Sequence, residues 1–356
     1  MNNPKPNTVK PYLLTRKLEP DNQETPISFI DSGMIDGKLF YRRNHFSYPS
    51  LSYANYFLPI NGIISTPLLL SLKDIVQLPS KTIKVVLECA GNKRSFFEPE
   101  VFGEQWGKGA ISQGNWKGVP LKSLLEQAGI KDNAKEVIVE GYDFGKRTDT
   151  DQVYTYARSL PIEKALHPDT IIAYEYNNKS IPFKHGYPLR LIVPYWYAMA
   201  SVKWIKQITV IDGKFKGPFQ TTDYMYYPNK ENDKDASPVT IINVNSTIQK
   251  PLDMEVLTTG KHIIKGIAWT GIGAIAKLEI SIDGGKNWAE AQLEDSSHMK
   301  YGWVSWSFKW TVQEKGEYVI LSKATDSSGR IQPTKAYWNR KGYGYHAMDK
   351  ISVKVE

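Results

Sequence analysis

The sequence has 356 residues and a mass of 40.4 kDa, which exceeds the size at which one hydrophobic core usually stops growing and favours two domains. A hydrophobic content of 41% with 12% aromatic residues predicts folded cores and excludes an intrinsically disordered chain. The net charge of +8 is spread without a long basic run, so we expect a small anion or an acidic protein as a partner and no nucleic acid.

Residues 1–35 are polar and rich in Pro and Asn, and they predict an arm that packs on the body of the protein or is partly disordered. No stretch approaches the roughly 20 apolar residues that a membrane helix needs, so we expect no membrane contact. Residues 1–6 lack the apolar core of a signal peptide. The sequence as it stands predicts a cytoplasmic protein, or a periplasmic or otherwise exported one if a signal peptide has been removed.

Residues 36–232 mix short strand-like runs with a few helical ones, which is typical of an α+β domain. Apolar runs predict strands at 85–88 and 136–140. Residues 121–128 carry apolar side chains at helical spacing, and Gly129 follows as a C-terminal stop. A second short helix is predicted within residues 160–166.

Cys89 is the only cysteine of the chain, which excludes an intrachain disulfide, a CxxC redox pair, a cysteine-based iron–sulfur site and the CxxCH haem attachment. It stands at the end of the predicted strand 85–88, where small residues predict a tight turn. Lys93 and Arg94 follow closely enough to favour the thiolate. A thiolate is a soft ligand, so this position suits one protein bond to a thiophilic metal whose other ligands come from elsewhere.

A charged stretch at residues 229–235 predicts the domain boundary, which gives an arm (1–35), a first domain (36–232) and a second domain (233–356). The second domain reads as all-β, because short alternating runs are broken by turns such as 283–287. This spacing fits an immunoglobulin-like sandwich. The tryptophans expected to fill the core of this sandwich are Trp269, Trp288, Trp303, Trp306 and Trp310.

Residues 271–276 (Gly-Ile-Gly-Ala-Ile-Ala) match the glycine pattern of dinucleotide-binding loops. That pattern needs a following helix whose N-terminus faces the pyrophosphate. Residues 277–282 instead alternate polar and apolar side chains, as a strand does. We therefore expect no nicotinamide nucleotide at this segment.

Five motifs occur in a fixed order in the first domain. They lie at 39–45 (Leu-Phe-Tyr-Arg-Arg-Asn-His), 89–94 (Cys-Ala-Gly-Asn-Lys-Arg), 106–121, 185–194 (His-Gly-Tyr-Pro-Leu-Arg-Leu-Ile-Val-Pro) and 201–204 (Ser-Val-Lys-Trp). Together they resemble the molybdenum-cofactor domain of the sulfite oxidase family, which includes the molybdenum domain of eukaryotic nitrate reductases. Residues 266–269 and 281–288 resemble the dimerisation domain of that family.

This resemblance extends over nearly the whole chain from about residue 36. It implies the fold class α+β, with a sulfite-oxidase-type molybdopterin-binding domain followed by an immunoglobulin-like β-sandwich. It also implies one molybdopterin cofactor with one molybdenum per chain, no haem, and a homodimer that forms through the second domain.

The same resemblance assigns the site residues. Cys89 would bind molybdenum. The residues that would hold the pterin and its phosphate, for which cations and amide-type groups are suited, are Tyr41, Arg42, Arg43, Asn44, His45, Asp143, His185, Arg190, Ser201, Val202 and Lys203. The residues that would bind the oxyanion substrate are Arg43, Arg94, Trp106, Tyr224 and Lys341, with Arg340 in place of Lys341 if the register shifts by one.

The expected reaction is oxidation of sulfite to sulfate by oxygen-atom transfer, with the electrons passed to an external acceptor, a cytochrome or dioxygen. Three segments depart from the family pattern and leave fewer arginines around the pocket: Lys341, Thr221-Thr222 and residues 198–200. Reduction of nitrate or another oxo-substrate and oxidation of a sulfane sulfur therefore remain alternatives. A metal-free binding or assembly module of the same fold is the alternative outside the enzymes.

Overall fold

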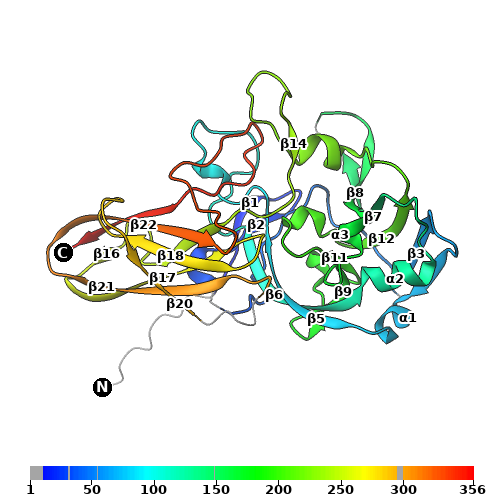
Figure 1. Cartoon of the computed structure of the whole chain (residues 1–356), viewed down its shortest axis with the longest axis horizontal. Coiled ribbons are helices and arrows are strands. Elements are labelled where there is room, and N and C mark those ends of the chain that lie inside the picture. Colours follow the sequence, from blue (N-terminus) through cyan, green and yellow to red (C-terminus); the bar gives the residue numbers. More distant parts are fainter. Residues whose placement is uncertain (1–10, 31–32, 54, 148, 295–299) are drawn as a thin grey trace.

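The computed structural model describes residues 11–356 except 31–32, 54, 148 and 295–299. Two domains lie side by side (Figure 1), a mixed first domain and a second domain built from strands. The described α-helices all belong to the first domain and are α1 (Leu72–Gln77), α2 (Leu121–Ala128) and α3 (Ile162–Ala165). In the part of the chain that the structure describes, no helix combines the length and hydrophobicity needed to cross a bilayer.

One sheet of the first domain leads to the cysteine. Its order is β10-β9-β6-β5, and β11 also pairs with β9, on the edge that β10 occupies. Its strands are β5 (Lys81–Glu88), β6 (Ile111–Pro120), β9 (Ile171–Tyr176), β10 (Lys179–Ser180) and β11 (Arg190–Ile192). The strand predicted at 85–88 is the buried end of β5, and Cys89 follows it directly, as predicted.

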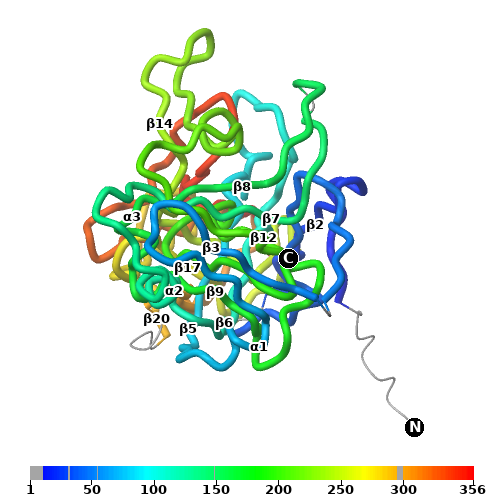
Figure 2. Tube along the Cα trace, turned by 90° about the vertical axis from the view of Figure 1, so that its right-hand side faces the viewer, coloured from blue at the N-terminus to red at the C-terminus, as the bar shows by residue number. Residues whose placement is uncertain are grey.

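A second sheet has the order β4-β3-β12-β7-β8, and Figure 2 shows β7, β8 and β12 side by side. Its strands are β3 (Phe57–Gly62), β4 (Leu68–Ser71), β7 (Glu136–Lys146), β8 (Val153–Pro161) and β12 (Ile205–Ile211). The helix predicted at 121–128 is α2, and Gly129 ends it in the left-handed conformation with φ 69°. The helix predicted within 160–166 is only α3, because residues 160–161 complete β8.

The described part of the arm packs on the first domain. Strands β1 (Leu14–Lys17) and β2 (Asn22–Glu24) form a hairpin, and residue 23 pairs with residue 42. The buried Glu24 carboxylate accepts hydrogen bonds from the backbone N–H of Gly107 and Gly109 at 3.2 and 3.3 Å. Asn22 accepts one from the backbone N–H of Asn44 at 2.6 Å. The arm thus supports segment 41–45 from outside.

The second domain is a sandwich of two sheets with the orders β15-β17-β21-β20 and β16-β23-β22-β18-β19. A short ribbon, β13 (Met225–Tyr226) with β14 (Ser237–Pro238), precedes it. The strands of the sandwich are β15 (Asn245–Lys250), β16 (Val256–Leu257), β17 (Gly260–Trp269), β18 (Ile275–Ser281), β19 (Ala289–Glu290), β20 (Gln292–Leu293), β21 (Val304–Val312), β22 (Gly316–Asp326) and β23 (Asp349–Val355). Residues 277–281 lie within β18, so the glycine pattern before them precedes a strand, as predicted.

The prediction that five tryptophans fill the sandwich core is wrong for three of them. Trp306 and Trp310 pack in that core. Trp269 and Trp303 belong to the core cluster of the first domain, and the Trp269 indole donates to Glu88 Oε2 at 2.8 Å. Trp288 is half-buried over a turn, with Lys323 Nζ 4.1 Å from its ring centroid. Two of the tryptophans that we expected in the sandwich core, Trp269 and Trp303, therefore pack with the first domain instead.

Candidate functional site

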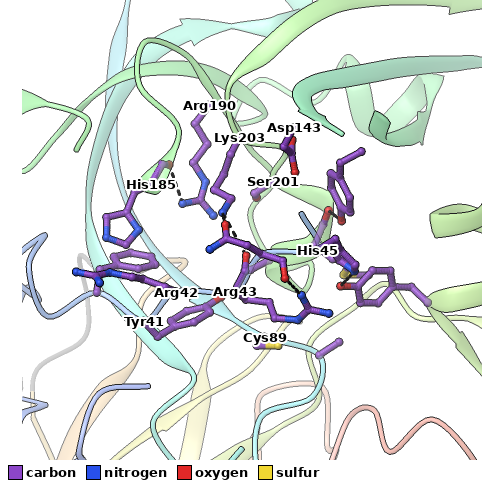
Figure 3. Close-up of a pocket in the computed structure, with 17 residues that line it drawn as sticks. Tyr41, Arg42, Arg43, His45, Cys89, Asp143, His185, Arg190, Ser201 and Lys203 are labelled. Carbon is purple, nitrogen blue, oxygen red and sulfur yellow. Dashed lines mark hydrogen bonds between the residues drawn. The ribbon is translucent and has the colours of Figure 1, made fainter. Parts of the chain in front are cut away.

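A cavity between the two sheets of the first domain gathers most of the predicted cofactor residues. Figure 3 shows their side chains directed into one space, with Cys89 at its lower edge and Arg190 and Asp143 at its upper edge. The predicted residues that line it are Tyr41, Arg42, Arg43, Asn44, His45, Cys89, Asp143, His185, Arg190, Ser201, Lys203 and Tyr224. These residues come from six segments of the chain.

The cysteine turn is held tightly. The Cys89 backbone N–H donates to Ala110 O at 2.9 Å, and the thiol is buried. Burial raises the pKa of Cys89, although Arg43 and Arg94 act to lower it. The expectation that Lys93 favours the thiolate is wrong, because Lys93 turns away from the cavity into the second domain. Arg43, Arg94 and the Gly91 backbone N–H favour the thiolate.

Arg190 and His185 lie at the far end of the cavity from Cys89. The Arg190 guanidinium carbon lies 5.2 Å from the ring centroid of Trp116 and 5.8 Å from that of Phe40, and its Nη1 donates to His185 O at 3.1 Å. Its Nε is buried without a hydrogen-bond partner among the described residues. Burial and the charge of Arg190 hold the pKa of His185 well below its ordinary value, so the imidazole is neutral.

A bulge in β7 brings Asp143 into the cavity. The pairing of β7 with β8 shifts between residues 140 and 144, and a Cβ on Gly141 would lie 2.5 Å from Asp143 Oδ1. Asp143 Oδ1 is buried without a hydrogen-bond partner in the described residues. Burial raises the pKa of Asp143 and lowers the pKa of Lys203. Lys203 donates to Arg43 O at 3.2 Å and also to Asn44 Oδ1.

An aromatic wall stands beside the cysteine. The Tyr224 hydroxyl hydrogen-bonds His45 Nε2 at 3.1 Å, and the His45 ring stacks on Tyr156 with centroids 4.9 Å apart. The Arg158 guanidinium lies 5.4 Å from the centroid of Tyr224. Sequence reasoning missed Tyr156 and Arg158. The sequence indicates them only indirectly: both lie in β8, which pairs with β7, and β7 carries Asp143.

Three predicted substrate residues, Arg43, Arg94 and Lys341, line a second cleft, which shares Arg43, Asn44 and His45 with the cavity. We call it the mouth cleft; it opens to solvent beside the exposed Phe102. Its charged and aromatic lining includes the cations Arg43, Arg94, Lys146, Arg147 and Lys341, the acidic residues Glu104, Asp149 and Asp223, and Tyr343. Two predicted residues line neither space: Trp106 is buried near Cys89 with an unpartnered indole N–H, and Val202 packs in the core.

The second domain holds Arg94 in place. Arg94 Nε donates to the carbonyls of Lys341 and Gly342 at 3.1 and 3.2 Å, and its Nη1 donates to Glu104 O at 3.1 Å. A Cβ on Gly91 would come within 2.7 Å of its guanidinium. These backbone contacts fix the direction of the side chain without neutralising its charge.

The charge of Asp143 acts on Lys203, but the cations of the site form few ion pairs with described carboxylates. Within the described residues, no carboxylate forms an ion pair with Arg43, Arg94, Arg190 or Lys203, whereas the neighbouring Arg42 pairs with Asp21 at 3.3 Å. No described group of three or more His, Cys, Asp or Glu side chains is arranged to hold a metal. Buried cations require negative charge nearby, so the site fits a phosphate-bearing cofactor and a small oxyanion. Of the described residues that line the cavity, Cys89 is the one predicted to bind a metal.

Comparison with known proteins supports this assignment. The family model of the oxidoreductase molybdopterin binding domain matches residues 45–219, and that of the Mo-co oxidoreductase dimerisation domain matches residues 237–356. Mouse mitochondrial sulfite oxidase is 33% identical over 97% of this chain and 66% of its own length. Arabidopsis thaliana sulfite oxidase is 33% identical over 93% of this chain and 91% of its own.

Among solved structures, the sulfane dehydrogenase SoxCD from Paracoccus pantotrophus superimposes with a TM-score of 0.80 at 26% identity. The match covers 93% of this chain and 83% of that one. The predicted fold class is therefore confirmed: a molybdopterin-binding domain is followed by a β-sandwich. The chain spans 66% of the length of the mouse and rat enzymes.

Proposed function

Because the chain belongs to the sulfite oxidase family of molybdopterin-dependent oxidoreductases, we propose that it oxidises sulfite to sulfate with a bound molybdenum cofactor. When bound, that cofactor supplies oxygen-atom transfer and takes up two electrons. Sulfite and water give sulfate, two protons and two electrons, and the electrons pass to an external acceptor, a cytochrome or dioxygen. Each chain would hold one molybdenum, and two chains would associate through the second domain.

The observation that carries the proposal is the set of unpaired cations around Cys89. Arg190, His185, Ser201 and Lys203 would hold the pterin and its phosphate at the end of the cavity remote from the cysteine. The unpartnered Arg190 Nε and Asp143 Oδ1 supply a donor and an acceptor that such a polar ligand would satisfy. Cys89 Sγ would bind the metal, whose positive charge offsets the rise in thiol pKa that burial causes.

Arg43 and Arg94 would bind the sulfite anion. Arg94 reaches the mouth cleft on backbone carbonyls alone, so it keeps its full charge for the substrate. The Tyr224 hydroxyl, held by His45, would orient a substrate oxygen. Fixed donors of this kind stabilise the charge that shifts between sulfur and oxygen during the reaction. Lys341 would attract the anion to the cleft, since it has no ion pair among the described residues.

Oxidation of a sulfane sulfur is the second candidate, and the structural similarity to SoxCD favours it. The two activities differ in the substrate. An assay of both substrates on the same preparation separates these candidates.

The test begins with the full chain produced in a host that makes molybdopterin. Elemental analysis should give about one molybdenum per chain, and sulfite should reduce ferricyanide in steady state. Cys89→Ser should remain folded but lose metal and turnover, because serine is a poor ligand for this soft site. Protein from a host that cannot make molybdopterin is the control.

Three results would overturn the proposal. Folded protein without molybdenum from the competent host would favour a binding or assembly module. Turnover of a sulfane substrate without turnover of sulfite would favour the second candidate. Wild-type sulfite turnover in Cys89→Ser would refute the metal assignment.

A further inference from the structure

Tyr343 belongs to a loop of the second domain that reaches the mouth cleft. It lines this cleft together with Arg43, Arg94 and Lys341. It lies two residues beyond Lys341, and no sequence motif pointed to it. The domain that joins two copies of the chain therefore also contributes an aromatic side chain to the space in front of Cys89.

The backbone of this loop is fixed. Asn339 accepts from the Tyr343 backbone N–H at 3.0 Å and donates to its carbonyl at 2.9 Å, so one amide side chain holds both backbone groups of Tyr343. Gly342 and Gly344 on either side have φ values of 60° and 66°. The Gly344 N–H donates to Ala90 O, next to the cysteine, at 2.8 Å. Tyr343 is thus placed relative to Cys89 by direct backbone contact.

The ring of Tyr343 lies between two predicted substrate residues. The Arg94 guanidinium carbon is 5.0 Å from its centroid. The Tyr224 ring stacks on it with centroids 5.2 Å apart and planes inclined by 27°. Cation–π contact and stacking both restrain the ring, so little side-chain entropy remains to be lost when the hydroxyl binds a ligand.

The hydroxyl of Tyr343 differs from that of Tyr224 in its hydrogen bonding. Within the described part of the chain it makes no hydrogen bond, whereas the hydroxyl of Tyr224 is engaged by His45. The positive charges of Arg94 and Arg43 act on the hydroxyl and oppose the rise in pKa that burial causes. A neutral phenol beside two unpaired arginines is a hydrogen-bond donor without an acceptor, at the place where an anion is expected.

We propose that the Tyr343 hydroxyl donates a hydrogen bond to the oxyanion and makes Tyr343 a specificity-determining residue of this site. The inference rests on the proposed function, because it assigns the hydroxyl to the same substrate. The hydroxyl favours small oxyanions, because their oxygens can accept hydrogen bonds from the phenol and from the arginines at the same time. In this chain, which has fewer arginines around the pocket than the family pattern, the phenol supplies an additional donor.

The test compares Tyr343→Phe, which keeps the ring between Arg94 and Tyr224, with Tyr345→Phe on the same loop. Tyr345 packs on Phe97 with centroids 5.1 Å apart and lines neither the cavity nor the mouth cleft. Calorimetric titration of the molybdenum-loaded full chain with sulfate gives a binding constant that does not depend on turnover. Steady-state assays give kcat and KM for sulfite.

Loss of one hydrogen bond to a charged ligand should weaken sulfate binding by about 10-fold or more in Tyr343→Phe and raise the KM for sulfite by a similar factor. Tyr345→Phe should stay within about twofold of wild type. Tyr343→Leu, which removes ring and hydroxyl, should be at least as impaired as Tyr343→Phe.

Wild-type sulfate affinity and KM in Tyr343→Phe, with impairment only in Tyr343→Leu, would show that the ring merely packs and would overturn the inference. If the wild-type protein binds sulfate but turns over no sulfite, the proposed function fails. A weaker affinity of Tyr343→Phe for sulfate would then still support the hydroxyl as an oxyanion ligand. Molybdenum content and the thermal transition confirm that each variant is folded.

Discussion

Lys93 and Asp349 face each other across the interface between the two domains, with Nζ 3.6 Å from Oδ1 and both side chains almost fully buried. Lys93 also donates to Asn245 Oδ1 and Ser246 O at 2.9 and 2.7 Å. Lys108 reaches the other carboxylate oxygen of Asp349 at 2.9 Å. The residue next to the predicted substrate ligand Arg94 therefore anchors the cysteine turn to the second domain.

Replacement of Lys93 by methionine should destabilise the protein by about 3 kcal/mol, because Asp349 loses one of its two cations and the acceptors in β15 lose their donor. Chemical denaturation followed by fluorescence measures this change. Lys122→Met is the matched control: Lys122 pairs with Glu126 on an exposed helix face, and its loss should cost no more than about 0.5 kcal/mol. Equal midpoints for the two variants would contradict the anchoring role.

Gly91→Ala should displace Arg94 without unfolding the protein. The new Cβ would lie 2.7 Å from the guanidinium, which is the movable end of a long side chain, and no positive φ opposes alanine there. We expect the KM for sulfite to rise about 10-fold, as for loss of one charged hydrogen-bond donor, with molybdenum content unchanged.

Gly213→Ala is the control for this substitution, because a Cβ there would meet nothing within 4 Å. An unchanged KM in Gly91→Ala would mean that the position of Arg94 does not matter to the substrate.

Arg190→Lys should lower the molybdenum content. A lysine ammonium cannot reproduce the planar guanidinium that lies beside Trp116 and Phe40 and leaves Nε free for a ligand. We expect less than about a tenth of the wild-type metal per chain, consistent with the 10- to 100-fold effects seen when groups around a metal site are altered. Arg16→Lys, which alters an ion pair on the arm, should retain wild-type metal. Full occupancy in Arg190→Lys would remove Arg190 from the cofactor site.

Lys164 should make stability depend on pH in the alkaline range. Burial lowers its pKa to about 8, although Asp169 acts to raise it, and its Nζ donates to Pro194 O at 2.9 Å. Between about pH 8 and pH 10.5 the unfolded chain binds a proton at Lys164 that the folded chain has lost. The free energy of unfolding therefore increases with pH over this interval.

The free energy of unfolding of the wild type, measured relative to Lys164→Met, should therefore increase by up to about 3 kcal/mol across that interval. The difference between the two proteins removes the contribution of the other groups that titrate there, which the variant shares. A difference that stays flat would show that Lys164 is not held in its neutral form.

The sequence was sufficient to predict the elements that depend on local pattern. The α2 helix and its Gly129 stop, the strand before Cys89 and the strand after residue 276 follow from periodicity and turn residues. Four of the five motifs, at 39–45, 89–94, 185–194 and 201–204, supply residues that line the cavity, whereas the motif at 106–121 supplies none.

Contacts between distant segments could not be predicted in this way. The direction of Lys93 depends on carbonyl and carboxylate groups more than 150 residues away in the chain. Trp269 and Trp303 belong to the core cluster of the first domain and Trp306 to that of the sandwich, and the sequence does not reveal which surface of the sandwich the first domain covers. Tyr343 lies in a loop with no repeating pattern, so only its contacts with Arg94 and Tyr224 reveal it.

The carbonyls that direct Arg94 come from residues 341 and 342, so the anion site is assembled only when both domains are folded and docked. The chain is therefore not a catalytic module with a detachable dimerisation module. A chimera that exchanges the second domain would have to keep the loop from Trp338 to Gly344, or the first domain would retain Cys89 but lose the carbonyls that hold Arg94.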